Sequence, residues 1–222
     1  MTTTDGPHPP RLDPIRLTNV VDGDPDTLEA RNGYEGQRYV ASDLSARDLR
    51  STSFRECELV GITAHDTDLR SAAFVETTIE RLDAPVLNAP RSRFRDVSIA
   101  HSRLGSAELY EAHWRSVHIS GSKLGFVNLH GADLCDVLFT DCAIGELDLR
   151  GATAERVSFV NTRVDSLDLG GATLTDVDLR SLEIRQLASL EGLKGATISP
   201  YQLADLAPLF AGHFGILVDD LP

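Results

Sequence analysis

The chain has 222 residues, of which 41% are hydrophobic and 25% are charged, a composition typical of a globular protein. Its 34 acidic and 21 basic side chains give a formal net charge of −13, which argues against direct binding of a nucleic acid. No long apolar run is present, and the opening segment MTTTDGPHPPRLDP lacks the apolar stretch of a signal peptide, so we expect no membrane association. The three cysteines, Cys57, Cys135 and Cys142, have no metal-ligand spacing and suit a reducing compartment, which favours a cytoplasmic location.

Residues 1–33 contain several prolines and no repeat. Segments of this kind at a chain end are often poorly ordered unless something holds them. We therefore predict a flexible N-terminal segment over residues 1–33, whose last part covers the start of the next domain near Tyr34 and Tyr39.

From Leu44 to Ile184, every fifth residue is hydrophobic or alanine. The run contains 29 positions without an insertion, and none of them is polar. The residue two places earlier is mostly small or apolar as well, as at Ala72, Val97 and Ala132. A period of five with two inward positions fits neither the 3.6-residue period of a helix nor the two-residue period of a strand. It predicts a solenoid whose chain turns a corner every five residues and whose coils bury a core against their neighbours.

Four stretches carry the same five-residue unit: SDLSARDLRSTSF (42–54), GADLCDVLF (131–139), LDLRGATAERVSF (147–159) and LDLGGATLTDVDLR (167–180). They resemble the A-(D/N)-L-x-x unit of the pentapeptide-repeat family, and the resemblance covers roughly residues 40–187. It implies an all-β solenoid, a right-handed quadrilateral β-helix with four pentapeptides to a coil and Leu or Phe at the centre of each. On this basis we predict about seven coils, in a domain that spans residues 34–190.

With 20 residues to a coil, aromatic side chains fall in two columns. The first contains Phe54, Phe74, Phe94 and Trp114, and the second contains Phe139 and Phe159. Offset stacking of such rings is favourable. We interpret both columns as core packing and predict no cofactor.

After Ile184 the five-residue register ends, and we predict a C-terminal helical cap over residues 191–222. Ser199 and Pro200 are residue types preferred at the N-cap and the first position of a helix. Pro208 should break that helix after Ala207. The cap has more apolar groups than one narrow rod end can cover, which favours a homodimer through residues 199–218. The candidate dimer residues are Leu209, Phe214 and Ile216.

The sequence contains no nucleophile elbow, no glycine-rich phosphate loop and no HExxH motif. Cys135 is an outward-facing thiol, and His101, His113 and His118 are interpreted as surface histidines rather than metal ligands. We therefore predict a protein without enzymatic activity and without a bound metal.

The charge is unevenly distributed along the repeats. Residues 41–132 carry 12 acids and 11 bases, whereas residues 133–183 carry 11 acids and four bases. Five arginines lie between Arg81 and Arg103, where the sign reverses. We take the acidic stretch as the candidate partner-binding surface. Its seven candidate residues are Asp133, Asp136, Asp141, Glu146, Asp148, Asp168 and Asp178.

Alignment of the repeats by twenties also places one polar residue of each coil in a row: Asp48, Asp68, Asn88, Glu108, Asn128, Asp148 and Asp168. A structural role is favoured, because Asp and Asn at such positions bond the amides of a turn. Arg50, Arg70 and Arg150 follow two residues later and would neutralise part of the row. As a set, the row could still present a regular anionic edge.

Two functions compete at this point. A general binding or scaffold module with an unknown protein partner is favoured, because a fold does not fix a function. The alternative rests on a more distant resemblance to family members that mimic duplex DNA and bind DNA gyrase, which also have an acidic rod and a C-terminal helical element. That resemblance implies a protein that protects or inhibits gyrase or a related topoisomerase.

Overall fold

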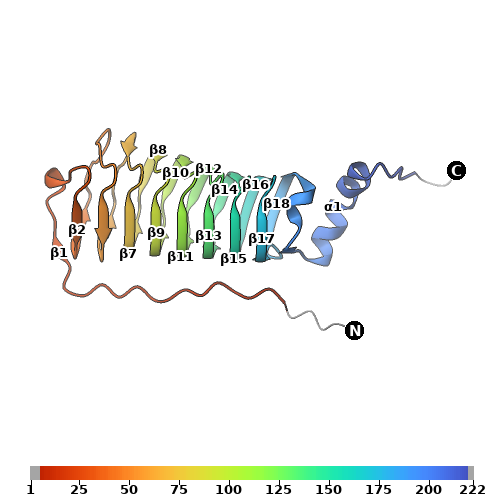
Figure 1. Ribbon diagram of the computed structural model, residues 1–222, viewed down its shortest axis with the longest axis horizontal. Coiled ribbons are helices and arrows are strands. Elements are labelled where there is room, and N and C mark those ends of the chain that lie inside the picture. Colours follow the sequence, from red (N-terminus) through yellow and green to blue (C-terminus); the bar gives the residue numbers. More distant parts are fainter. Residues whose placement is uncertain (1–5, 220–222) are drawn as a thin grey trace.

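A computed structural model describes residues 6–219 as a rod of stacked parallel strands (Figure 1). Residues 1–5 and 220–222, which belong to the predicted N-terminal segment and cap, lie outside the described residues. Through the repeats, each turn pairs with the next at an offset of 20 residues, as Phe94 with Trp114 and Trp114 with Leu134. The predicted solenoid with four pentapeptides to a coil is confirmed.

Two sheets form the sides of the rod. The larger sheet contains β1 (Val21–Asp22), β2 (Gly33–Glu35), β3 (Gln37–Val40), β4 (Ser53–Arg55), β5 (Glu58–Val60), β7 (Ala73–Glu80), β9 (Arg93–Ala100), β11 (His113–Ser120), β13 (Asp133–Thr140), β15 (Thr153–Val160), β17 (Thr173–Asp178) and β19 (Ala196–Thr197). The smaller sheet contains β6 (Thr67–Asp68), β8 (Asp83–Asn88), β10 (Arg103–Glu108), β12 (Lys123–Asn128), β14 (Ala143–Asp148), β16 (Thr162–Asp168) and β18 (Leu182–Ala188).

The rod has about nine turns, slightly more than the predicted number of about seven. The extra turns come from residues outside the regular repeat. At one end Val21 of β1 pairs with Gln37 of β3, 16 residues later. At the other end Val177 of β17 pairs with Ala196 of β19, 19 residues later. A count by fives cannot detect these turns, because neither offset is a multiple of five.

The core lies along the axis of the rod and is filled by the central residue of each pentapeptide. Leu129, Leu134, Phe139 and Ile144, one on each side of a single coil, are all buried. Both predicted aromatic columns exist: the rings of Phe54 and Phe74 stack at 5.3 Å, those of Phe74 and Phe94 at 4.9 Å, and those of Phe139 and Phe159 at 5.0 Å. The interpretation of these rings as core packing is therefore confirmed.

One corner of the rod is formed by residues with left-handed backbone angles. We call it the 136 corner, and its members have φ between 50° and 60°: Glu56, Glu76, Asp96, Ser116, Asp136, Arg156 and Asp176. Their 20-residue spacing stacks them one above another. Most of them are acidic, which gives this edge a negative character.

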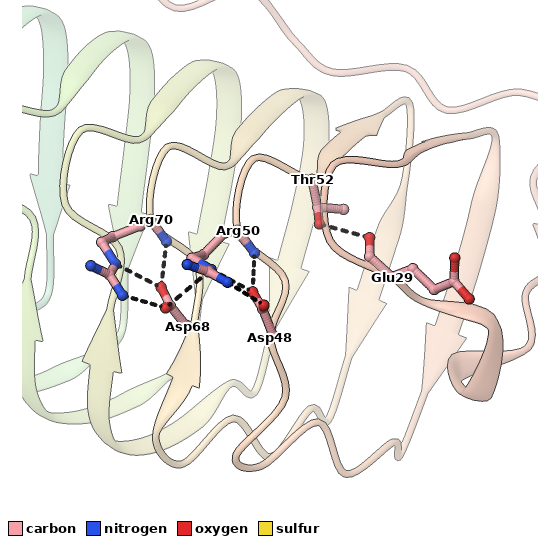
Figure 2. Close-up of polar contacts among 6 residues, drawn as sticks. All are labelled: Glu29, Asp48, Arg50, Thr52, Asp68 and Arg70. Atoms are coloured by element: carbon pink, nitrogen blue, oxygen red, sulfur yellow. Dashed lines mark hydrogen bonds and ion pairs between the residues drawn. The ribbon is translucent and has the colours of Figure 1, made fainter.

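The N-terminal end of the rod is closed by the chain itself. The 3-10 helix η1 (Pro25–Thr27) lies over the first full coil and leads into Leu28, which is 2% exposed. The Tyr34 hydroxyl donates to the Thr27 carbonyl over 2.7 Å. Figure 2 shows the second contact, in which Thr52 Oγ1 donates to the Glu29 carbonyl over 3.2 Å. Arg47 donates to the carbonyl oxygens of Pro25 and Leu28.

Residues 6–20 form no helix or strand and lie alongside the rod in an extended path (Figure 1). The flexibility predicted for residues 1–33 and the domain boundaries after residues 33 and 190 stay predictions.

The C-terminal end carries the 3-10 helix η2 (Leu190–Leu193) and the helix α1 (Pro200–His213). Ser199 forms a capping box with Gln202, whose side chain also donates to the carbonyls of Leu179 at 2.7 Å and Leu182 at 2.8 Å. The predicted break after Ala207 is wrong, because α1 continues through Pro208. A proline inside a helix removes one backbone hydrogen bond, and α1 nevertheless continues to His213.

Candidate functional site

The seven candidate acids do not gather on one face of the rod. Asp133 and Asp136 lie on β13, Asp141 follows it, Glu146 and Asp148 lie on β14, Asp168 lies on β16 and Asp178 lies on β17. Because β13 and β17 belong to the larger sheet and β14 and β16 to the smaller one, the acids encircle the C-terminal coils. The candidate surface is thus a ring around the rod rather than a patch on one face, and we call these seven acids the acidic belt.

The polar row exists as predicted, and its main role is structural. Neighbouring members pair across the rungs, as Asp48 with Asp68 and Asp148 with Asp168. In Asp48, Asp68, Asp148 and Asp168, one carboxylate oxygen accepts the backbone N–H two residues later, over 3.0–3.2 Å. These bonds are the turn contacts that favour Asp before a corner.

Arginines neutralise much of this row. Arg50 donates to Asp48 through Nε at 2.8 Å and Nη2 at 2.7 Å, and it also lies 3.7 Å from Asp68 on the next rung (Figure 2). Arg150 repeats the arrangement with Asp148 and Asp168. The hydrogen bond from Arg50 lowers the pKa of Asp48 to about 2. For Asp148, burial raises the pKa but the bonds from Arg150 outweigh it, so the net pKa is lowered.

Asp178 has the same local partner although it lies outside the row. Arg180 donates to it through its backbone N–H at 3.1 Å and through Nη2 at 2.7 Å. Those bonds lower the pKa of Asp178, with the side-chain bond as the largest cause. The rows of aspartates are therefore alternating charges and not a bare anionic edge.

Two of the seven candidates are not on the surface, and the prediction is wrong for them. Asp148 is 2% exposed and Asp136 is 8% exposed. Asp136 is covered because Arg156, one turn further on, donates to it through Nε at 2.6 Å and Nη2 at 2.8 Å. The backbone N–H of Arg11 adds a bond of 2.9 Å. The bond from Arg156 lowers the pKa of Asp136 to about 2.

The accessible acids of the belt are fewer. Asp141 and Glu146 are exposed, and within residues 6–219 neither forms an ion pair. Glu183 on β18 is exposed in the same way and was not among the candidates. Asp133 is exposed but lies 2.9 Å from His113 Nδ1.

The arginines between Arg81 and Arg103 do not form one cluster. Arg93 and Arg95 lie on β9 in the larger sheet, whereas Arg103 lies on β10 in the smaller one. In the larger sheet, Arg93 is beside His113 and Arg95 is beside Arg115 of β11. These residues lie toward the N-terminal side of the acidic belt, but they do not form a basic patch, because Arg95 lies 3.6 Å from Asp96 and His113 lies 2.9 Å from Asp133.

The helical cap is the most apolar exposed region of the described chain. No residue of α1 is buried. Leu209, Phe214 and Ile216, the candidate dimer residues, are exposed, and so are their neighbours Tyr201, Leu203, Leu217 and Val218. The helix α1 lies beyond the last full turn of the rod, at the end that carries the acidic coils (Figure 1).

The void inside the rod is apolar. A narrow void of about 60 Å³ is lined by side chains such as Leu104, Leu109 and Ile119. Among residues 6–219, no three His, Cys, Asp or Glu side chains come together to hold a metal. No helix in that range is long and apolar enough to cross a membrane.

A four-sided parallel solenoid with one five-residue unit on each side is the fold of pentapeptide-repeat proteins. The period and the 20-residue register give this chain that fold. No family model matches the sequence, and no curated protein matches it.

The solved structures to which the chain is similar include QnrB1, a plasmid-mediated fluoroquinolone resistance protein. A trypsin-treated form is 19% identical with a TM-score of 0.33, and the match covers 86% of this chain and 91% of that chain. HetL, a pentapeptide-repeat protein involved in heterocyst differentiation regulation in the cyanobacterium Nostoc, is 17% identical with a TM-score of 0.24, over 76% of this chain and 92% of that chain. These similarities concern the fold alone.

Proposed function

We propose that the chain is a non-enzymatic binding rod that takes a protein partner at its C-terminal end. The observation that carries the proposal is the juxtaposition of the acidic belt with the uncovered apolar cap. Protein interfaces combine an apolar centre with a polar rim, and this end of the rod supplies both. We also propose a cytoplasmic location, because all three cysteines are free thiols.

Local ion pairs do not cancel the field of the belt. Residues 133–183 carry 11 acids against four bases, so their net charge is −7 even when every base is counted. Summed charge of one sign steers an oppositely charged partner at a distance. Binding should therefore weaken as salt is added.

The charge density favours a second candidate function, mimicry of duplex DNA toward gyrase or a related topoisomerase. At 20 residues to a turn, residues 133–183 make about 2.5 turns, or roughly 12 Å at a strand spacing of about 4.8 Å. Duplex DNA carries about seven charges over that length, at one per ~1.7 Å. The net charge of −7 on these residues matches it. Residues 41–132 are nearly neutral, so the contact would lie at the C-terminal coils.

The test compares two triple variants that remove the same charge from exposed acids. The belt variant carries Asp141→Asn, Glu146→Gln and Glu183→Gln, and the control carries Glu29→Gln, Glu35→Gln and Asp83→Asn at the N-terminal end of the rod. Proteins captured from a lysate at low and high salt are compared for wild type and both variants. A partner that the control retains and the belt variant loses supports the proposal. Equal capture by both variants contradicts it.

A supercoiling assay with purified gyrase decides the second candidate. The wild-type rod should inhibit or protect gyrase, and the belt variant should do so at least several-fold less well than the control variant. A wild-type rod without effect at several-fold molar excess would eliminate the DNA mimic and leave the general binding proposal standing.

A further inference from the structure

The N-terminal segment is bound along the rod at sites far away in the sequence. His8 Nδ1 lies 2.9 Å from Asp176 Oδ2, and the Arg11 backbone N–H donates to Asp136 Oδ1 over 2.9 Å. Both carboxylates belong to the 136 corner, and Figure 1 shows the segment running beside the rod toward its C-terminal half. A segment without strand or helix is thus docked by named contacts.

The spacing of the segment matches the spacing of the rungs. Asp136 and Asp176 are two turns apart, or about 10 Å, and the three residues from His8 to Arg11 span about 10 Å when extended. Eight strand steps separate the rung of Asp176 from β1. They amount to roughly 38 Å, whereas the 13 residues from His8 to Val21 span about 40 Å in a polyproline II conformation. The segment from His8 to Val21 is therefore almost fully extended.

The composition of the segment explains why it docks without joining a sheet. Pro7, Pro9, Pro10 and Pro14 lack the N–H that a β ladder needs. Proline also restricts the undocked chain, so docking loses less conformational entropy. The contacts that hold the segment are then those of the His8 side chain with Asp176 and of the Arg11 backbone N–H with Asp136.

The rod supplies a groove for the rest of the segment. Between Arg11 and β1, Leu12, Asp13, Pro14 and Ile15 face Thr78, Val97, Ser98, Ser116 and His118 across a space of about 360 Å³. The segment therefore touches the rod firmly at Asp136 and Asp176 and loosely elsewhere. A ligand held at two anchor points and loosely elsewhere can be exchanged.

We propose that the 136 corner is a binding groove for an extended, proline-containing peptide with a histidine or basic side chain, and that residues 7–16 occupy it as an internal ligand which a partner peptide displaces. Asp136, held in place by Arg156, is the acceptor for a peptide N–H. Asp176 is the acceptor for a cationic or histidine side chain three residues earlier. The proposal is independent of what the acidic belt and the cap bind.

Two full-length variants separate the backbone contact from the side chain. Arg11→Pro removes the N–H that Asp136 accepts and keeps an extended backbone, whereas Arg11→Ala keeps that N–H. Both remove one trypsin site, so the rate of cleavage between Arg16 and Leu17 is comparable between them. Because hydrogen bonds to charged groups are strong, Arg11→Pro should be cleaved at least about tenfold faster than Arg11→Ala. Equal rates would overturn the proposal.

Binding in trans is measured with a fluorescent peptide of residues 6–17, GPHPPRLDPIRL, titrated onto the full-length Arg11→Pro protein. It should bind at least about tenfold more tightly than the same peptide carrying Arg11→Pro, and more weakly to wild type, whose groove is occupied. Equal binding of the two peptides would contradict a peptide groove. A wild-type dimer that Arg11→Pro abolishes and Arg11→Ala retains would show the segment reaching a second copy, and would overturn the internal ligand.

Discussion

At the N-terminal end of the rod, Leu28 is packed under η1, and Arg47 holds the carbonyls that flank it. At the C-terminal end, α1 is fastened through Ser199 and Gln202 at its first turn, and none of its residues is buried. Both ends of a solenoid expose strand edges that invite other chains. The comparison shows that this chain closes one end with its own residues and leaves the other apolar and open.

The largest effect on folding is expected from a substitution in the core at the middle of the rod. Phe139→Asp should abolish soluble folding, because an unpaired carboxylate would lie in a packed core. Val160→Asp is the matched control, since Val160 lies on the outside of β15 and is 41% exposed. Soluble yield and circular dichroism check both. A soluble, fully structured Phe139→Asp protein would mean that the register is wrong.

Truncation of one leucine at each end tests the comparison directly. Leu28→Ala should destabilise the rod by about 2–4 kcal/mol, because it leaves a cavity under η1. Leu203→Ala on α1 should change stability by less than about 0.5 kcal/mol, since Leu203 is exposed. Urea unfolding measures both. Equal losses would show that the C-terminal cap is packed as tightly as the N-terminal one.

Asp136 on β13 links the N-terminal segment to the acidic coils, because it accepts the backbone N–H of Arg11. Its folded pKa of about 2 lies below the usual value near 3.9. A depressed pKa contributes stability above the unfolded value, and that stability is lost as the pH falls from about 4 to 2. Asp136→Asn should therefore cost about 2 kcal/mol at pH 7. The difference from wild type should shrink toward pH 2 in urea titrations, and a constant difference would contradict the ion pair with Arg156.

The sequence predicted the repeat well, because the central positions have to be apolar wherever the chain turns every five residues. The sequence also predicted that arginines neutralise part of the aspartate row, because Arg50, Arg70 and Arg150 follow their aspartates by two residues. Both features depend on residues at a fixed spacing along the sequence.

Other features depend on contacts that no local pattern encodes. The burial of Asp136 needs Arg156 from the next turn and Arg11 from 125 residues earlier. The prolines of the N-terminal segment indicate an extended chain, but not the corner on which it docks. The first and last turns were missed because their offsets of 16 and 19 residues break the repeat.

The smallest effect on stability is expected at the open end, where the change concerns assembly. We predict that wild type without its partner is a homodimer through the cap, because an exposed apolar surface of this extent favours association. The partner proposed above would then replace the second copy. The triple change Leu209→Ser, Phe214→Ser and Ile216→Ser should leave the urea midpoint nearly unchanged, since all three side chains are exposed. Light scattering should give twice the chain mass of 24.1 kDa for wild type and the chain mass itself for the triple variant.

The control for that experiment lies at the closed end, where Val21 and Val40 are exposed to a similar extent, 63% and 55%. Val21→Ser with Val40→Ser also removes exposed apolar surface, but from an end whose strands are already covered by the chain. These changes should leave the dimer intact. A wild-type mass of 24.1 kDa at micromolar concentration would contradict the dimer, and the apolar cap would then be left for the partner proposed above. Loss of the dimer in the Val21 and Val40 variant would instead assign the interface to the N-terminal end and reverse the comparison.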